Sequence, residues 1–206
     1  LDANLIEAAI TLKTKAIMPV HLYGQMVDMV QLKKLAQKHN LFIIEDAAHA
    51  LPSTYKKKNV GNIGDATVFS FYATKNISSG EGGAVSTSRK HIAEILRKLR
   101  LHGIDKGAAE RYTKRYRHWD MPVLGWKYNM DNIQASLLIG QLNRIEKLWK
   151  KRDALWRLYE DELRKLTKVR ILRTLFGVKH ARHLFTILVQ ASKRDSLLWK
   201  LQDRGI

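Results

Sequence analysis

The sequence predicts an α/β fold built on a largely parallel sheet that helices cover. In roughly the first hundred residues, short apolar segments alternate with segments whose apolar residues recur at helical spacing. The apolar segments are nearly continuous, which is typical of strands buried on both faces of a parallel sheet. The chain has 206 residues, of which 45% are hydrophobic, enough for one sizeable core and part of a second.

The first half of the chain supplies most of the expected sheet. Residues 15–21 predict a strand that ends in a Tyr23-Gly24 turn. Asp28 is placed to cap a helix, because the apolar residues after it share one helical face. The other expected elements are strands over residues 41–45, 66–71 and 84–87 and a helix from about residue 90 to residue 101.

The second half of the chain has a different organisation. Residues 105–122 are charged and aromatic without a clear period, which predicts a long loop. Residues 131 to about 166 predict a long helix, and residues 184–189 predict a strand followed by a helix from about Asp195. We expect a large domain over residues 1–140 and part of a smaller domain over residues 141–206. The missing initiator Met and the abrupt end suggest a piece of a longer protein.

Several classes of protein are disfavoured by composition. Cysteine is absent, which excludes disulfides, thiolate metal sites and a cysteine nucleophile. No apolar run approaches the ~20 residues of a membrane-spanning helix, and no signal peptide is visible. The sequence therefore predicts a cytoplasmic protein without membrane insertion.

The net charge of +18 raises the question of nucleic acid. Basic residues concentrate at Lys56-Lys57-Lys58, which resembles a turn, at residues 111–117 and at residues 144–173. Trp149, Trp156 and Tyr159 lie along one helical face of the last region, which predicts a packed stripe with a solvated basic back. A basic surface also attracts phosphorylated or nucleotide-linked small molecules. A nucleic-acid-binding module remains an alternative.

Side chains that can bind a ligand or take part in catalysis follow two of the predicted strands. Strand 41–45 ends in Glu45-Asp46-Ala47-Ala48-His49, and the strand before Ser70 leads to Lys75 and a glycine-rich turn over residues 80–83. Ligands of α/β sheets bind at these strand ends. An amine near a carboxylate suits an imine-forming cofactor whose ring nitrogen needs an acidic partner. That description fits pyridoxal 5'-phosphate, PLP.

Six segments, taken together, carry a family resemblance: Pro19-Val20-His21-Leu22-Tyr23-Gly24, Glu45-Asp46-Ala47-Ala48-His49-Ala50, residues 69–76, Gly80-Glu81-Gly82-Gly83, Leu101-His102-Gly103 and residues 124–130. The chain resembles the DegT/DnrJ/EryC1/StrS family of PLP-dependent sugar aminotransferases, which have the aspartate-aminotransferase-like fold of type I. By that comparison, an N-terminal part and the end of the small domain are missing.

The resemblance implies roles for individual residues. Lys75 matches the lysine that forms the imine with PLP and then moves the proton between substrate and cofactor. Asp46 matches the carboxylate that pairs with the pyridine nitrogen, and His49 matches a residue near the phenolic oxygen of the cofactor. Ser70 matches a hydroxyl that binds the cofactor phosphate.

Two further residues are implied to act across a dimer interface. Lys127 stands where many family members have an asparagine that approaches the phosphate of the neighbouring subunit's cofactor, and Asn129 replaces an arginine. A lysine can bind phosphate as a point charge. The resemblance therefore implies a homodimer, with the contact assigned to either Lys127 or Asn129.

The function implied by the resemblance is transfer of an amino group from glutamate to a nucleotide-linked keto sugar, for cell-surface polysaccharide, lipid A or antibiotic sugars. Alternatives remain beside it. Some family members are dehydratases with histidine in place of the lysine, and Lys75 argues against that chemistry. A metal hydrolase using His21, Asp46 and His49 lacks a tight ligand motif. A catalytically inactive fragment of the same family is a further alternative.

Overall fold

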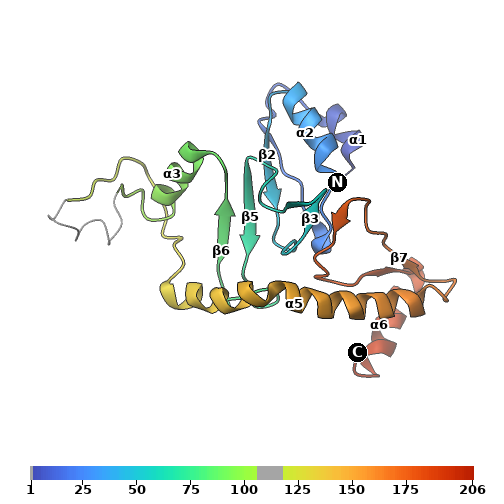
Figure 1. Cartoon of the computed structure of the whole chain (residues 1–206). Coiled ribbons are helices and arrows are strands. Elements are labelled where there is room, and N and C mark those ends of the chain that lie inside the picture. The colour runs from blue at the N-terminus through green and yellow to red at the C-terminus, as the bar shows by residue number, and fades with distance from the viewer. Residues whose placement is uncertain (1, 106–117) are drawn as a thin grey trace.

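The main sheet has four strands in the order β1-β2-β5-β6. In the computed structural model, which describes residues 2–105 and 118–206, the sheet stands above one long helix (Figure 1). β2 (Phe42–Asp46) pairs in parallel with both β1 (Ala16–Ile17) and β5 (Ala66–Ser70). The predicted α/β class and the parallel pairing of these strands are confirmed.

β6 (Gly83–Ser86) is the exception, because it runs antiparallel to β5. The connection over residues 71–82 contains no helix, so the chain cannot cross to the far end of the sheet and start a parallel strand there. Instead it turns back at once: the amide of Phe71 donates to the carbonyl of Gly82 at 2.8 Å. Gly80 and Gly82 have φ of 83° and 127°, a conformation that glycine adopts without strain.

The helix α2 (Met29–Lys38) covers the sheet on the β1–β2 side, as predicted (Figure 1). Asp28 caps it by accepting hydrogen bonds from the amides of Val30 and Gln31. Its apolar face is buried on the sheet: Met29, Leu32 and Ala36 pack with Ile17 and Ile43. The first hundred residues also form the short helices α1 (Ala3–Ile6), η1 (Glu7–Ala9), η2 (Leu22–Gly24) and α3 (Lys90–Leu99).

The chain also forms two small sheets. β3 (Thr54–Tyr55) forms a hairpin with β4 (Lys58–Asn59) and also pairs with β8 (Val178–Lys179). Lys56 and Lys57 form the predicted turn, with φ of 47° and 67° as a two-residue hairpin turn requires. The second sheet pairs β7 (Arg170–Ile171) with β9 (Ile187–Leu188), followed by η3 (Ala191–Lys193) and α6 (Arg194–Gln202). The strand predicted over residues 184–189 is thus only two residues long.

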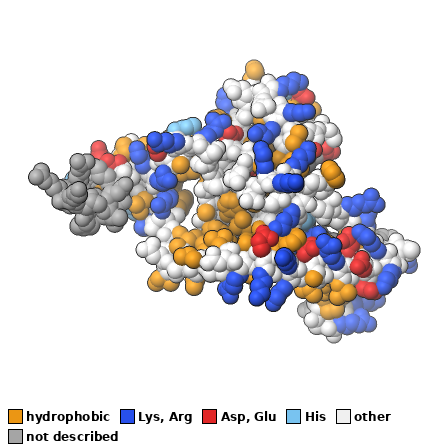
Figure 2. Space-filling model, viewed as in Figure 1, with side chains coloured by type: hydrophobic (Ala, Val, Ile, Leu, Met, Phe, Trp, Pro, Cys, Tyr) orange, Lys and Arg blue, Asp and Glu red, His pale blue; other side chains and the backbone are white. Residues whose placement is uncertain are grey.

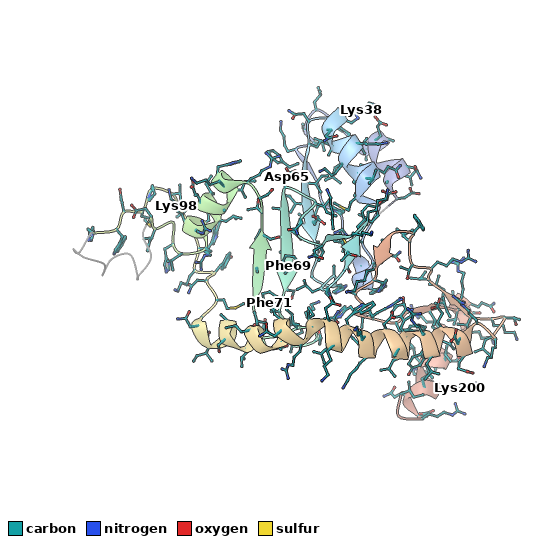
Figure 3. All side chains as sticks on the ribbon, in the orientation of Figure 1. Lys38, Asp65, Phe69, Phe71, Lys98 and Lys200 are labelled. Carbon is teal, nitrogen blue, oxygen red and sulfur yellow. The ribbon has the colours of Figure 1, made fainter. Side chains whose placement is uncertain are left out.

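The long helix α5 (Asn132–Leu163) runs along one end of the sheet and continues without a break through residue 140 (Figure 1). Its N-cap is Asp131, which accepts from the amide of Gln134. Phe71, at the end of β5 nearest α5 (Figure 3), packs with Ile77 and Leu138. Of the predicted aromatic stripe, Trp156 is buried with an exposed fraction of 7% and Trp149 donates to the carbonyl of His180, whereas Tyr159 is 55% exposed, so the stripe packs only in part.

Residues 106–117 lie outside the described residues, and with them most of the loop predicted over residues 105–122 and the basic segment 111–117. In the described part that remains of this loop, residues 118–122 form neither helix nor strand. Among the described helices, none is both long and apolar enough to cross a membrane.

The glycines of two family-like segments permit a close backbone crossing. The amide of His102 donates to the carbonyl of Trp126 at 2.7 Å, which brings residues 101–103 against residues 123–127. A Cβ on Gly103 would lie 1.7 Å from the carbonyl oxygen of Val123, and one on Gly125 would lie 2.2 Å from the Gly103 nitrogen. Only glycine fits either position without movement of the backbone.

Substitution of Gly103 by Ala is therefore expected to lower the free energy of unfolding by more than about 2 kcal/mol, because the residue also has φ of +81°. Gly140→Ala is the matched control, since a Cβ there meets nothing within 4 Å inside α5. That change should stabilise the protein by about 0.5–1 kcal/mol. Urea denaturation of both variants measures the difference, and equal effects would contradict the close crossing.

Candidate functional site

The carboxyl ends of β2 and β5 bring four predicted site residues to one edge of the sheet. β2 and β5 are parallel neighbours, with Asp46 opposite Val68 in the register. The amide of Ala47 donates to the carbonyl of Val68 at 2.8 Å, which holds the segment after β2 against β5. His49, Ser70 and Lys75 line one small pocket there, together with Ala47, Ala48, Leu51, Asn76 and Ile77. Asp46 lies beside this pocket on β2.

A single turn after β5 holds the hydroxyl and the amine of the site. Ser70 ends β5, and its Oγ accepts from the amide of Tyr72 at 3.3 Å. The amide of Lys75 donates to the carbonyl of Tyr72 at 2.9 Å. Lys75 itself is half-buried. These hydrogen bonds fix the backbone at Ser70 and Lys75, while the lysine side chain keeps access to the pocket.

Asp46 is half-buried at the end of β2. Its Oδ1 accepts from the amide of Ala48 at 3.0 Å. Its backbone is fixed on the β1 side, because its amide donates to the carbonyl of Pro19 and its carbonyl accepts from the amide of His21, both at 2.9 Å. The backbone of Asp46 is thus fixed by the segment after β1, and its carboxylate is fixed by the amide of Ala48.

His49 is oriented by the turn that follows β1. Its Nδ1 accepts from the amide of Tyr23 at 3.3 Å, and its ring stacks on the Tyr23 ring at 6.2 Å with an interplanar angle of 6°. Burial lowers the pKa of His49 below its ordinary value, the charge of Lys75 lowers it further, and the charge of Asp46 partly opposes both. His49 is thus a neutral imidazole that lies in the fields of both charged site residues.

His183 is a further residue of the site that the sequence reasoning missed. Its ring lies 4.6 Å from the His49 ring, and its Nδ1 is 3.2 Å from Oδ1 of Asn76. The amide group of Asn76 donates from Nδ2 to the carbonyls of Leu51 and Ala181, so its Oδ1 is left to accept the His183 proton. Burial, followed by the neighbouring His49, lowers the pKa of His183 to about 4. His183 is therefore neutral and donates through Nδ1.

Arg152 on α5 is a second residue that the sequence reasoning missed. Its Nε and Nη2 are buried and find no hydrogen-bond partner within the described part of the chain. Burial lowers the pKa of Arg152, and its charge contributes to the lowered pKa of His183. Two buried guanidinium nitrogens that lack a partner in the described part of the chain are costly, so this position suits an anion.

Lys127 and Asn129 do not line the Lys75 pocket. Lys127 is exposed and pairs with Leu101 in an isolated antiparallel bridge. Asn129 is half-buried, and its Oδ1 is closed to solvent without a described partner. The next residue, Met130, lies against the glycine-rich turn, where a Cβ on Gly82 would meet its Cε at 2.4 Å. The structure therefore places both residues outside the Lys75 pocket, and only Met130, which follows Asn129, lies against the turn after Lys75.

His21 is fully occupied by protein contacts. Its Nε2 lies 2.8 Å from Oε2 of Glu45, and its Nδ1 accepts from the amide of Val27 at 3.3 Å. Over residues 2–105 and 118–206, no three His, Cys, Asp or Glu side chains gather in a way that could hold a metal ion. The alternative of a metal site formed by His21, Asp46 and His49 therefore finds no support in this geometry.

The burial of another histidine, His180, leads to a prediction of how the stability of the protein depends on pH. It is buried with an exposed fraction of 6%, and burial, followed by the charge of Arg182, lowers its pKa to about 4. The unfolded chain binds this proton near the ordinary pKa of about 6.5, so the free energy of unfolding should fall as the pH drops from about 7 toward 4. Urea denaturation at pH 7 and pH 5 should show a smaller loss for His180→Gln than for the wild type. His91 is exposed, so His91→Gln serves as the control and should lose as much free energy of unfolding as the wild type. If His180→Gln also loses as much as the wild type, the prediction is wrong.

The donor set of the site fits PLP. An amine suits the aldehyde of the cofactor, a carboxylate suits its pyridinium, and a hydroxyl suits its phosphate. Lys75, Asp46 and Ser70 offer these groups at one edge of an α/β sheet, where such sites occur. This set of side chains on an α/β sheet is therefore compatible with the class of PLP-dependent enzymes.

Comparison with known proteins gives the family. The family model described as the DegT/DnrJ/EryC1/StrS aminotransferase family matches residues 1–206, and the chain belongs to this family. GDP-perosamine synthase of Caulobacter vibrioides is 38% identical over 210 residues, which cover 100% of this chain and 54% of that protein.

Solved structures agree with the family assignment. Helicobacter pylori PseC, an aminotransferase involved in the biosynthesis of pseudoaminic acid, has a TM-score of 0.91 and 32% identity, over 100% of this chain and 54% of its own. Spr1654 from Streptococcus pneumoniae, solved in a PLP form, has a TM-score of 0.88 and 29% identity, over 100% of this chain and 56% of its own. The type I fold expected from the sequence is thus confirmed. The chain spans about half the length of the curated relatives it matches.

Proposed function

We propose that the complete protein is a PLP-dependent aminotransferase that moves an amino group from glutamate to a nucleotide-linked keto sugar. The observation that carries this proposal is the place of Lys75, which shares a pocket with His49 and Ser70 at the strand ends beside Asp46. Membership in an aminotransferase family supports the reaction class. GDP-perosamine synthase among the relatives supports a nucleotide-linked sugar.

Each residue of the site has a part that follows from its chemistry. PLP, when bound, supplies an electron sink for the bonds at the amine-bearing carbon. The Lys75 amine would hold the cofactor and would move a proton to and from that carbon. The Asp46 carboxylate keeps the pyridine nitrogen protonated, and the Ser70 hydroxyl donates to the phosphate.

His49 has a different role, because it is neutral and its Nδ1 is used by Tyr23. Its remaining proton is on Nε2, which can donate to an oxygen of the cofactor or substrate. The contact with His183 limits how far the His49 ring can turn. We propose that this pair keeps one donor fixed over the site without adding a positive charge next to Lys75.

The experiment that tests the function uses the complete protein loaded with PLP. Addition of glutamate without acceptor should remove the visible absorbance of lysine-bound PLP and release 2-oxoglutarate in stoichiometric amount. Nucleotide-linked keto sugars should then restore that absorbance and gain an amino group, measured by mass. A protein that binds PLP but transfers no amine from glutamate to any such sugar would contradict the proposal.

We further propose that the complete protein is a homodimer. Hydrophobic side chains gather over the N-terminal half of α5 and the neighbouring sheet ends (Figure 2). Ile133, Leu137 and Ile139 have exposed fractions of 78%, 54% and 62%. An apolar surface of this kind is typical of a protein–protein interface. Lys127 and Asn129 precede this part of α5, which supports the proposal that one of them contacts a partner's cofactor phosphate.

Complementation between two impaired variants, Lys127→Ala and Lys75→Ala, tests the role of Lys127 across the interface. Lys127→Ala should weaken cofactor retention, because a positive charge near the phosphate is lost. Mixed with Lys75→Ala, it should regain activity, since one of the two sites in the hybrid dimer then receives both wild-type lysines. Hybrids that form but stay inactive would show that Lys127 serves its own subunit or neither.

A further inference from the structure

A buried hydrogen bond joins His21 to Glu45 near the end of β2. Oε2 of Glu45 is 2.8 Å from Nε2 of His21, and both side chains have an exposed fraction of 0%. Nδ1 of His21 accepts from the amide of Val27, so the ring proton is on Nε2 and points at Glu45. None of the proposed catalytic steps uses either residue.

Glu45 collects hydrogen bonds from three separate segments. Besides His21, which follows β1, it accepts at Oε1 from the amide of Gly64 at 2.6 Å and from the Thr67 hydroxyl on β5 at 3.0 Å. Burial raises the pKa of Glu45, but the hydrogen bonds from His21 and Gly64 outweigh it and leave the pKa below its ordinary value. An ionised carboxylate thus ties the segments on both sides of β2 to this strand.

The same contacts determine where Asp46 lies. Glu45 and Asp46 are consecutive in β2, so their side chains point to opposite faces of the sheet. The backbone amide of His21 donates to the Asp46 carbonyl at 2.9 Å, while the His21 ring bonds to Glu45. His21 therefore holds two consecutive residues of β2, one through its backbone and one through its side chain.

We propose that Glu45 and His21 are positioning residues, which fix the end of β2 so that Asp46 meets the pyridine nitrogen of the cofactor. This inference rests on the proposed function. The pair does not touch the reacting groups, since Glu45 points away from the face that carries Asp46. A buried pair with every partner satisfied holds one geometry, whereas loss of one member leaves β2 free to shift.

A double-mutant cycle in the complete PLP-loaded protein tests this. Glu45→Gln keeps the size and an acceptor for Gly64 and Thr67 but loses the charge that His21 faces. It should lower the rate of amine transfer by about tenfold, the coupling expected within one hydrogen-bond network. In an Asp46→Asn background the same change should lower the rate less than about twofold, because the Asp46 charge that Glu45 positions is already absent.

Asp65→Asn is the matched control. The Asp65 carboxylate also accepts a backbone bond on β2, from the amide of Ile43 at 2.7 Å, but it lies at the opposite end of the sheet (Figure 3). This variant should lower the free energy of unfolding without coupling to Asp46 in the rate. If Glu45→Gln leaves no folded protein, His21→Gln replaces it in the same cycle.

The outcomes separate this inference from the function on which it rests. A wild type that transfers amine, with Glu45→Gln equally costly in both backgrounds, would overturn the positioning role alone. A variant that loses stability but keeps the wild-type rate would overturn it as well. A wild type that transfers no amine would contradict the proposed function itself.

Discussion

Replacement of Lys75 by Ala is expected to abolish amine transfer in the complete protein. The lysine is the one proposed group that both holds PLP and moves the proton, and a positioned proton-transfer group alone contributes about 10²–10⁴-fold to a rate. Turnover should therefore fall by at least that factor. The visible absorbance of lysine-bound PLP should also disappear, because the amine that forms the bond is gone.

Lys58→Ala provides the control for this prediction. Lys58 is exposed on the β4 strand of the hairpin, so its loss removes the same charge without touching the pocket. Both variants should unfold at similar urea concentrations. A Lys75→Ala protein that retains the spectrum and the rate of the wild type would show that the pocket of Ser70 and His49 is not the PLP site.

Local signals in the sequence predicted the helices well. Asp28 and Asp131 each cap the helix that was expected after them, because an N-cap is decided by a few neighbouring residues. The direction of β6 was not predictable in the same way. It depends on how residues 71–82 return along the chain, and an apolar strand reads the same in either direction.

The residues of the candidate site also differ in how well the sequence predicted them. Asp46, His49, Ser70 and Lys75 follow two strands that are neighbours in the sheet, so their meeting could be predicted from strand ends. His183 comes from a segment with no expected role. Its hydrogen bond to Asn76 joins residues 107 positions apart, and no local pattern reports a contact of that kind.

The hydrogen bond between Glu45 and His21 was missed for a different reason. Both residues lie in segments that carry the family resemblance, and the sequence drew attention to His21 only as a metal ligand. Its burial and its bond to Glu45 give it a different chemistry, since neither nitrogen is left for a ligand. The residue types were visible in the sequence, but their pairing required the parallel register of β1 and β2.

Replacement of Asp46 by Asn should slow the chemical step strongly while PLP stays bound. Asparagine keeps the size of the side chain and an oxygen for the Ala48 amide, so the end of β2 should keep its shape. What is lost is the negative charge that favours a protonated pyridine nitrogen. Removal of one preorganised electrostatic contact costs on the order of 2.7–4 kcal/mol of activation free energy, or about 10²–10³-fold in rate.

The effect should appear in kcat rather than in PLP retention, because the charge on the ring nitrogen matters most when electrons move into the ring. Asp131→Asn is the control: it removes one carboxylate but leaves an N-cap residue in front of α5, and its rate should match the wild type. Single-turnover rates with glutamate measure the chemical step directly. If Asp46→Asn slows that step less than about threefold, far below the loss expected for such a contact, then another group must hold the pyridine nitrogen.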